Sequence, residues 1–155
     1  MSKAFTKESD SDGAQELPDR EISSAPNLVT AEGLTLIDAA IDTHSAAHAS
    51  ALAAGDKDAA ARSARELRYW TARRASAQVQ PPPSGSDEVA FGSAVNLLRS
   101  DGRRVSYRIV GEDEADPANS LLSWVSPLAR SMMGKGVGEE IEAGATVATI
   151  TAISI

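Results

Sequence analysis

Three consecutive prolines at positions 81–83 divide the sequence into two parts with different hydrophobic periods. Before them apolar residues recur every three or four positions, which is typical of helices; after them apolar and polar residues alternate, which is typical of strands. Proline interrupts a helix and removes a donor from a sheet, so neither structure can run through this point. Because Ser84 and Gly85 follow, we interpret residues 81–86 as a stiff, proline-rich linker.

The part before the linker, residues 30–80, is predicted to form two helices joined by a tight turn. Thr30 is a typical helix N-cap, Gly55 is a typical helix end, and Asp56 can cap a second helix. A seam with alternating spacings of three and four residues runs along the first helix and consists of Leu34, Ile37, Ile41, His44, His48 and Ala51. Such a seam packs against a partner helix, so we expect an antiparallel coiled-coil hairpin over residues 30–80.

The two predicted helices carry opposite charges. The second helix holds the basic residues Arg62, Arg65, Arg68, Arg73 and Arg74, and the first holds the acidic residues Glu32, Asp38 and Asp42. The arginine series could approach nucleic acid or an acidic protein surface. A row of charges more often forms a solvated face, so we favour pairing of the arginines with acids across the hairpin.

The part after the linker, residues 87–155, is predicted to be a small antiparallel β-sheet with one short helix. Strands are expected at 89–98, 104–110, 121–125 and 146–155, and Val105, Tyr107 and Ile109 would share one face of the second. Ser126 followed by Pro127 is an N-cap and first-turn pattern, which predicts a short helix just after it. The fold class is therefore α+β.

The first 29 residues are expected to be a disordered acidic tail. They hold six acidic and three basic side chains, two prolines and few large apolar residues, so burial there cannot offset the entropy of ordering. The whole chain of 155 residues has a net charge of −7 and no cysteine. These features exclude disulfide scaffolds and thiolate metal sites and disfavour unaided binding of duplex DNA. No apolar run has signal-peptide or membrane-spanning length, so we expect a cytoplasmic protein.

Two groups of residues are candidate metal ligands. Asp56 and Asp58 lie at the predicted hairpin tip, where two carboxylates could contribute to a Mg²⁺ site completed by another protein. Both are also ordinary capping residues, and we favour capping. His44 and His48 are spaced to share one helical face, but without a third ligand we interpret them as polar members of the seam.

The acidic run Glu112, Asp113, Glu114 and Asp116 lacks the ligand spacing of a calcium loop, so we interpret it as a turn or as part of a docking surface. No serine, histidine and acid arrangement and no phosphate-binding glycine loop can be assembled from the sequence. The residues alone thus predict a helical hairpin and a small α+β module with no active site of its own.

Residues 107–138 read YRIVGEDEADPANSLLSWVSPLARSMMGKGVG. This string resembles the C-terminal domain of the bacterial transcript-cleavage and elongation factors of the GreA/GreB family. Weaker matches lie upstream, at VTAEGL, at the GD pair of the tip, at RYWTARRASAQV and at FGSAV. The resemblance therefore extends in order over most of the chain.

The resemblance implies a fold and a partner. The fold would be an N-terminal antiparallel coiled coil joined to an FKBP-like domain. The FKBP-like domain would dock on RNA polymerase at its secondary channel, and the coiled coil would enter the channel to regulate elongation. In the family, tip acids hold a Mg²⁺ ion that assists cleavage of backtracked RNA by the polymerase. The chain would then be a monomeric accessory factor without catalytic residues or a cofactor of its own, would share Mg²⁺ only with the polymerase, and would meet nucleic acid only in the elongation complex and no membrane.

Residue by residue, the resemblance assigns RNA polymerase binding to Val125, Ser126, Pro127 and Leu128. It assigns the first tip acid to Asp56. Ala59 stands where the family has its second tip acid, and Asp58 lies one position too early. The arms of the hairpin are also shorter than is usual in the family. We therefore expect polymerase binding to survive where stimulation of cleavage does not.

Two alternatives stay open. An FKBP-like fold could serve a free-standing prolyl isomerase or peptide binder, which needs an aromatic-lined pocket built from Phe91, Tyr107 and Trp124. The chain could also be a non-cleaving regulator that shares the docking domain and keeps a reduced coiled coil.

Overall fold

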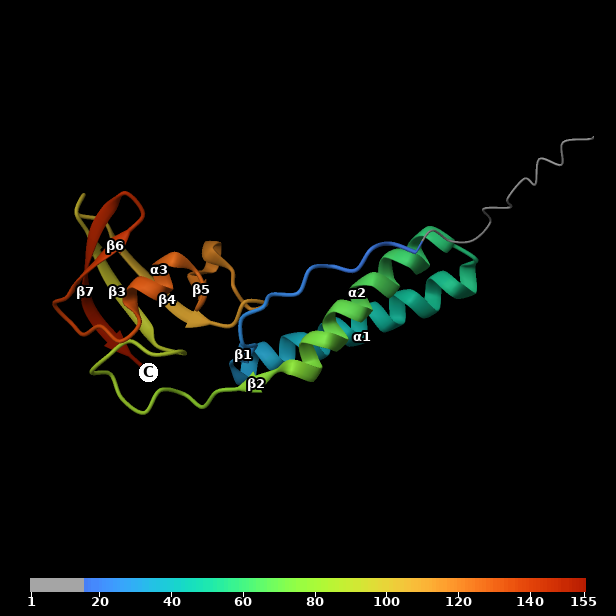
Figure 1. Ribbon diagram of the computed structural model, residues 1–155, viewed down its shortest axis with the longest axis horizontal. Coiled ribbons are helices and arrows are strands. Elements are labelled where there is room, and N and C mark those ends of the chain that lie inside the picture. The colour runs from blue at the N-terminus through green and yellow to red at the C-terminus, as the bar shows by residue number, and fades with distance from the viewer. Residues whose placement is uncertain (1–15) are drawn as a thin grey trace, which may run out of the picture. The chain divides into compact units, whose positions relative to one another are not determined.

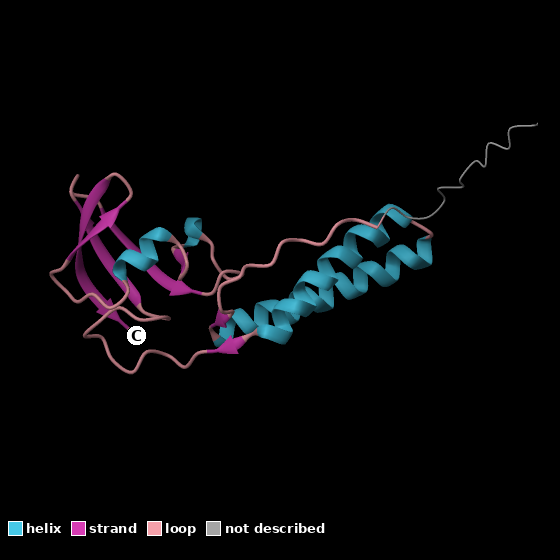
Figure 2. Ribbon diagram, in the orientation of Figure 1, coloured by secondary structure: helices cyan, strands magenta, loops and turns pink. Residues whose placement is uncertain are grey.

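The computed structural model describes residues 16–155 (Figures 1 and 2). These residues form two compact units. The first contains residues 40–72 and, in the described part of the chain, residues 16–22. The second contains residues 23–39 and 73–155. The boundary therefore crosses both helices and does not coincide with residues 81–86, which hold neither helix nor strand.

The helical pair consists of α1 (Ala31–Ala54) and α2 (Lys57–Ser76). Thr30 caps α1, since its Oγ1 accepts a hydrogen bond from the Gly33 amide at 2.9 Å. Of the predicted seam, Ile37 and Ala51 are buried and the other four members are partly buried. None of the helices between residues 16 and 155 has both the length and the apolar character needed to cross a bilayer.

A glycine ends the first helix and allows the sharp turn into the second. Gly55 has φ 67°, a conformation that side chains other than glycine rarely adopt. The Gly55 amide donates to the Leu52 carbonyl at 3.2 Å, and the Asp56 amide donates to the Ala51 carbonyl at 3.0 Å. This is the Schellman arrangement, which satisfies the last carbonyls of a helix.

The β-domain holds five strands in the order β5-β4-β3-β7-β6. The strands are β3 (Ala94–Arg99), β4 (Arg104–Val110), β5 (Leu121–Ser123), β6 (Glu140–Ala143) and β7 (Thr146–Ser154). The pairs β3–β4, β3–β7 and β6–β7 are antiparallel, whereas β4–β5 is parallel. The α+β class is confirmed, but the sheet is mixed where an antiparallel sheet was predicted. Residues 111–120, with the short 3-10 helix η1 (Pro117–Asn119), carry the chain back so that β5 runs in the direction of β4.

The core of this domain lies between the sheet and the short helix α3 (Pro127–Met132). Ala129 and Met132 of α3 are completely buried together with sheet residues such as Ile109. Val105 and Tyr107 pack against the same core, so they share a face with Ile109 as predicted. Strand β6 was not predicted from the sequence. Ile141 is its one buried residue, and a single apolar position does not show a hydrophobic period.

Residues 27–29 differ from the predicted disordered tail. Leu28 and Val29 form strand β1 (Leu28–Val29), which pairs in parallel with β2 (Gln78–Val79), and both Asn27 and Val29 are buried. The amino-acid composition did not indicate this strand, because a strand of two residues needs only one apolar side chain directed inward. Residues 16–26 contain no helix or strand but contact α2 at several points, and residues 1–15 of the predicted tail lie outside the described residues.

Candidate functional site

The turn that was expected to bind a partner, residues 125–128, connects β5 to α3. Ser126 is the N-cap of α3: its Oγ accepts from the Ala129 amide at 3.3 Å and donates to the Ser123 carbonyl at 2.7 Å. The Ser126 amide also donates to the Ser123 carbonyl, at 3.0 Å. The hydroxyl of Ser126 is thus engaged within the turn, and its effect is to shape the turn.

The same turn presents little side chain to solvent apart from one proline. Pro127 is exposed, Val125 and Ser126 are half-buried, and Leu128 packs against the core. Trp124, just before the turn, also packs against the core, and its amide donates to the Val110 carbonyl at 3.0 Å. The turn is therefore preformed by its hydrogen bonds and by packing against the core, and Pro127 is its most exposed residue. Its role in binding stays a prediction.

At the hairpin tip, Asp56 acts as the cap of α2. Its Oδ1 accepts from the Ala59 amide at 3.0 Å, and its carbonyl accepts from the Ala60 amide at 3.0 Å. Asp58 lies in the first turn of α2 and is exposed. A carboxylate in the first turn of a helix is stabilised by the helix dipole, so both acids have a structural role.

The tip offers few of the ligands that a metal ion needs. Mg²⁺ requires near-octahedral oxygen coordination, and the tip offers two carboxylates, one of which already accepts an amide hydrogen bond. Within residues 16–155, no group of three or more histidine, aspartate or glutamate side chains is placed to hold a metal ion. A metal at Asp56 and Asp58 would need most of its ligands from another molecule.

The two seam histidines each contact α2. His48 Nδ1 lies 3.1 Å from the Ala60 carbonyl and 3.4 Å from Ser63 Oγ. His44 Nε2 lies 3.9 Å from a Glu66 carboxylate oxygen. Each ring thus has polar partners on α2, and the two do not converge on one point with a third ligand. This arrangement agrees with their interpretation as polar members of the seam.

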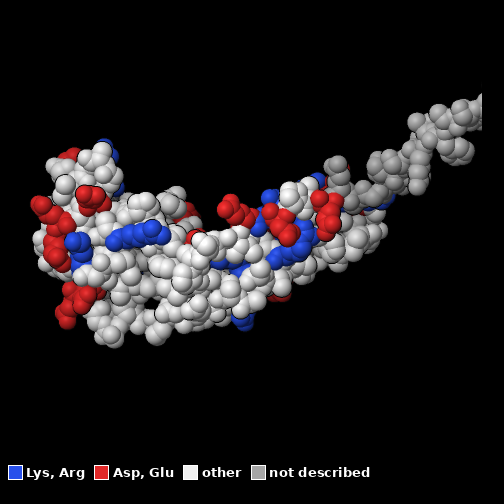
Figure 3. Space-filling view, in the orientation of Figure 1, with Lys and Arg blue, Asp and Glu red and all other residues white. Residues whose placement is uncertain are grey.

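The arginines of α2 pair differently from the prediction. Arg74 does pair with Asp38 of α1, at 2.7 Å. Arg65 and Arg68 instead bind residues 17–19 of the N-terminal segment, and Figure 3 shows acidic and basic side chains intermingled over this part of the helical pair. Pairing across the hairpin therefore accounts for only part of the series, because the N-terminal segment supplies acceptors for Arg65 and Arg68.

The acidic run after β4 binds the base of the helices. Asp113 Oδ2 accepts from Arg73 Nε at 2.5 Å, and Glu114 Oε2 accepts from Thr30 Oγ1 at 2.5 Å. Glu112 Oε2 lies 3.6 Å from Arg73 Nη2, too far for a hydrogen bond. The run is thus a turn that binds the base of the helices, which agrees with its interpretation as a turn.

Sequence reasoning missed the residues that complete this cluster. Arg73 is only 2% exposed, and its Nη2 donates to Asn27 Oδ1 at 2.7 Å. Asn27 in turn donates to the Arg73 carbonyl at 2.8 Å. We name Asn27, Arg73 and Asp113 the root cluster. Nothing in the sequence distinguishes Arg73 from the other four arginines of its helix.

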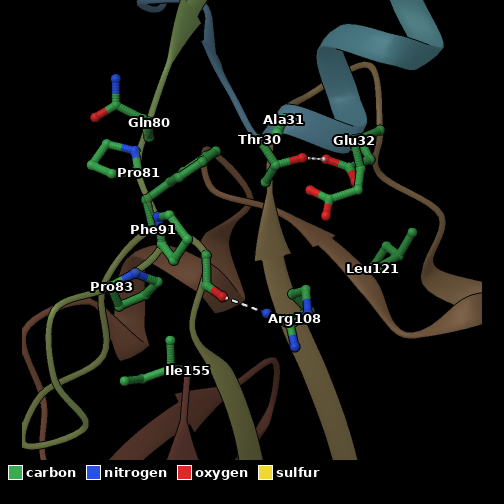
Figure 4. A pocket seen from close by; sticks show the side chains of 13 residues that line it. Thr30, Ala31, Glu32, Gln80, Pro81, Pro83, Phe91, Arg108, Leu121 and Ile155 are labelled. Atoms are coloured by element: carbon green, nitrogen blue, oxygen red, sulfur yellow. Dashed lines mark hydrogen bonds between the residues drawn. The ribbon is translucent and has the colours of Figure 1, made fainter.

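A cavity of about 470 Å³ is lined in part by the hydrogen-bonded pair Thr30 and Glu114 (Figure 4). Phe91 is the one aromatic residue in its lining, and the chain's own prolines 81–83 form part of its wall. Arg108, which also lines it, donates to the Gly92 carbonyl at 2.8 Å. Tyr107 and Trp124 pack against the core and do not line this cavity. Of the three aromatic residues considered for a prolyl isomerase pocket, this cavity therefore contains one, Phe91.

Comparisons with known proteins match this chain to one family. The family model described as transcription elongation factor, GreA/GreB, C-terminal, matches residues 83–155. Transcription elongation factor GreB of Neisseria meningitidis serogroup A is 43% identical over 79 residues, which are 50% of this chain and 48% of that protein. GreA of Nautilia profundicola is 45% identical over 65 residues, 41% of this chain and 40% of that protein. The match thus spans about half the length of these relatives or less.

Two solved structures align with this chain at low sequence identity. GreA factor homolog 1 of Thermus thermophilus aligns with a TM-score of 0.40 and 16% identity, covering 84% of this chain and 99% of that one. A GreA/GreB factor of Nitrosomonas europaea aligns with a TM-score of 0.40 and 15% identity, covering 83% of this chain and 98% of that one. The sequence match lies in the β-domain with its preformed turn, so it is residues 83–155 that are similar to the C-terminal domain of the GreA/GreB family.

Proposed function

We propose that this chain is a Gre-like transcription elongation factor. It binds RNA polymerase at the secondary channel through residues 125–128 and regulates elongation in the cytoplasm. The observation that carries this proposal is the preformed turn with Pro127 as its most exposed residue, which lies inside the matched domain at the positions assigned by resemblance. A preformed turn loses little conformational entropy on binding, so it suits a docking role.

The factor acts as an accessory and not as an enzyme. It lends at most Asp56 and Asp58 to a Mg²⁺ ion held mainly by the polymerase. Ala59 cannot provide the second tip acid, and Asp56 already caps α2. We therefore propose that it occupies or tunes the channel more than it stimulates RNA cleavage.

Polymerase binding can be tested with two proline variants of the same domain. Pro127→Arg places a long charged side chain at the tip of the turn and should abolish retention of core RNA polymerase in a pull-down. Pro117→Arg is the matched control, since Pro117 is also exposed and also begins a short helix. It should bind like the wild type. Equal retention of both variants would refute docking through this turn.

The role of the tip can be tested in a cleavage assay on backtracked elongation complexes. We expect the wild type to add little to the polymerase's own cleavage. Asp56→Asn removes the negative charge but keeps a good N-cap. The variant therefore distinguishes a role of Asp56 in metal binding from its role in capping α2. Strong stimulation by the wild type that disappears in Asp56→Asn would show that the factor does lend a metal ligand.

A further inference from the structure

Residues 17–20, which read Leu-Pro-Asp-Arg, lie against α2 although they form no helix or strand. Arg65 Nε donates to the Pro18 carbonyl at 2.8 Å, and Arg68 Nη2 donates to the Leu17 carbonyl at 3.1 Å. Arg68 Nε also donates to Asp19 Oδ1 at 2.5 Å. We name residues 17–20 the strap.

The charges of the next pair are reversed, since here the strap supplies the arginine and α2 supplies the acidic residue. Arg20 Nη1 donates to Glu66 Oε2 at 2.7 Å. Its guanidinium carbon also lies 3.7 Å from the centre of the Tyr69 ring, a distance typical of a cation–π contact. We name Arg65, Glu66, Arg68 and Tyr69 the strap-binding face. Their spacings of three and four residues place them side by side on the helix.

An apolar contact completes this surface. Leu17 of the strap lines a cavity of about 350 Å³ together with three alanines of α2, which are Ala60, Ala61 and Ala64. Their small side chains leave room beside the helix for an apolar residue. Along the extended strap, Leu17 thus lies beside the alanines of α2, and Asp19 and Arg20 then bind the strap-binding face.

The contacts that hold the strap are of the kind that open easily. The Arg68 and Asp19 side chains are 38% and 73% exposed, and those of Arg20 and Glu66 are 34% and 28% exposed. Ion pairs in contact with water contribute little to stability. A segment without secondary structure held by such pairs detaches at far lower cost than global unfolding.

From these observations we infer that the strap-binding face is a docking surface for an extended peptide of a partner protein. The peptide presents an apolar residue, an acidic residue and an arginine in the order of Leu17, Asp19 and Arg20. The strap is the intramolecular occupant of this surface and competes with the partner. Detachment of the strap therefore controls access to it.

The chemistry of the face favours a peptide over nucleic acid. Two of the arginine hydrogen bonds go to backbone carbonyls of the strap, which only a polypeptide provides. Glu66, which binds the guanidinium of Arg20, would repel a phosphate at the same place. A single-stranded oligonucleotide is thus the alternative that the experiment must exclude.

The test uses the full chain and a fluorescent peptide with the sequence of residues 16–24, ELPDREISS. A chain with Asp19→Ala and Arg20→Ala has a weakened strap and should bind the peptide at least about tenfold more tightly than the wild type, since a tethered competitor acts at a high effective concentration. Glu21→Ala is the matched control, because Glu21 is an exposed neighbour and has no ion pair within the described residues. It should behave like the wild type.

Two further measurements make the outcome decisive. Adding Arg68→Asp to the weakened-strap chain should abolish binding of the normal peptide, and a peptide carrying Asp19→Arg should restore it. Circular dichroism of each variant should show wild-type helix content. Equal peptide affinity in the wild type and the weakened-strap chain, absence of binding by that folded chain, or its preference for a single-stranded oligonucleotide would each overturn the inference.

Discussion

Two neighbouring arginines in the last turn of α2 show how differently a buried and an exposed position use charge. Arg73 is 2% exposed and donates to an Asp113 carboxylate whose side chain is 8% exposed. Arg74 pairs with Asp38 at 2.7 Å, nearly as closely as the 2.5 Å between Arg73 and Asp113, but the Arg74 and Asp38 side chains are 47% and 51% exposed. Breaking a buried pair leaves an uncompensated charge without water, whereas breaking an exposed pair returns both charges to solvent. Similar distances therefore correspond to very different energies.

The largest expected effect follows from removing Arg73. Arg73→Ala leaves the Asp113 carboxylate and the Asn27 amide without their buried partner. We expect a loss of about 3–5 kcal/mol in the free energy of unfolding, the range for one partner of a buried pair. Urea denaturation measures it. A loss no larger than that of Arg74→Ala would contradict the comparison.

A close backbone contact beside the root cluster gives the next prediction. A Cβ atom at Gly111 would collide with the Leu28 carbonyl oxygen, which belongs to the backbone and cannot rotate away. Gly111→Ala should therefore lower the free energy of unfolding by about 1–3 kcal/mol, the usual cost of forcing extra volume into a packed site. Gly85→Ala is the matched control in the thermal melt, because a Cβ there meets no atom within 4 Å. Equal melting temperatures for both variants would mean that β1 is not held against Gly111.

The half-buried turn before α3 should give an intermediate result. Ser126→Ala removes the cap oxygen that accepts from the Ala129 amide. The expected loss in unfolding free energy is about 1 kcal/mol. Ser126→Thr keeps a capping hydroxyl and should recover most of it, as thermal melts can show. If both variants lose the same stability, the hydroxyl is not what holds the turn.

The smallest effect is expected at Arg74. Arg74→Ala breaks an exposed pair with Asp38 and should change the unfolding free energy by less than about 1 kcal/mol. Added salt should shrink even this difference, because ions screen exposed charges. A loss of several kcal/mol, or one insensitive to salt, would place Arg74 among the buried charges and remove the contrast with Arg73.

Much of the fold could be predicted because its signals are local. The seam spacing, Gly55 with Asp56, and Ser126 with Pro127 each act within a few residues, and all three shape the structure. The number of carboxylates at the tip is also fixed by the sequence, since Ala59 supplies none whatever the fold. The parallel pairing of β5 and the short strand β6 lacked any such local signal.

The sequence by itself determined where the helical pair turns and where α3 begins, because caps and glycines act between residues close along the chain. Only the tertiary structure decided which charges are buried. Arg73 meets Asn27 and Asp113 across separations of 46 and 40 residues, and Arg68 meets Asp19 across 49. Burial is a property of everything packed around a group, so two arginines that read alike in sequence acquire different energies once the chain has folded.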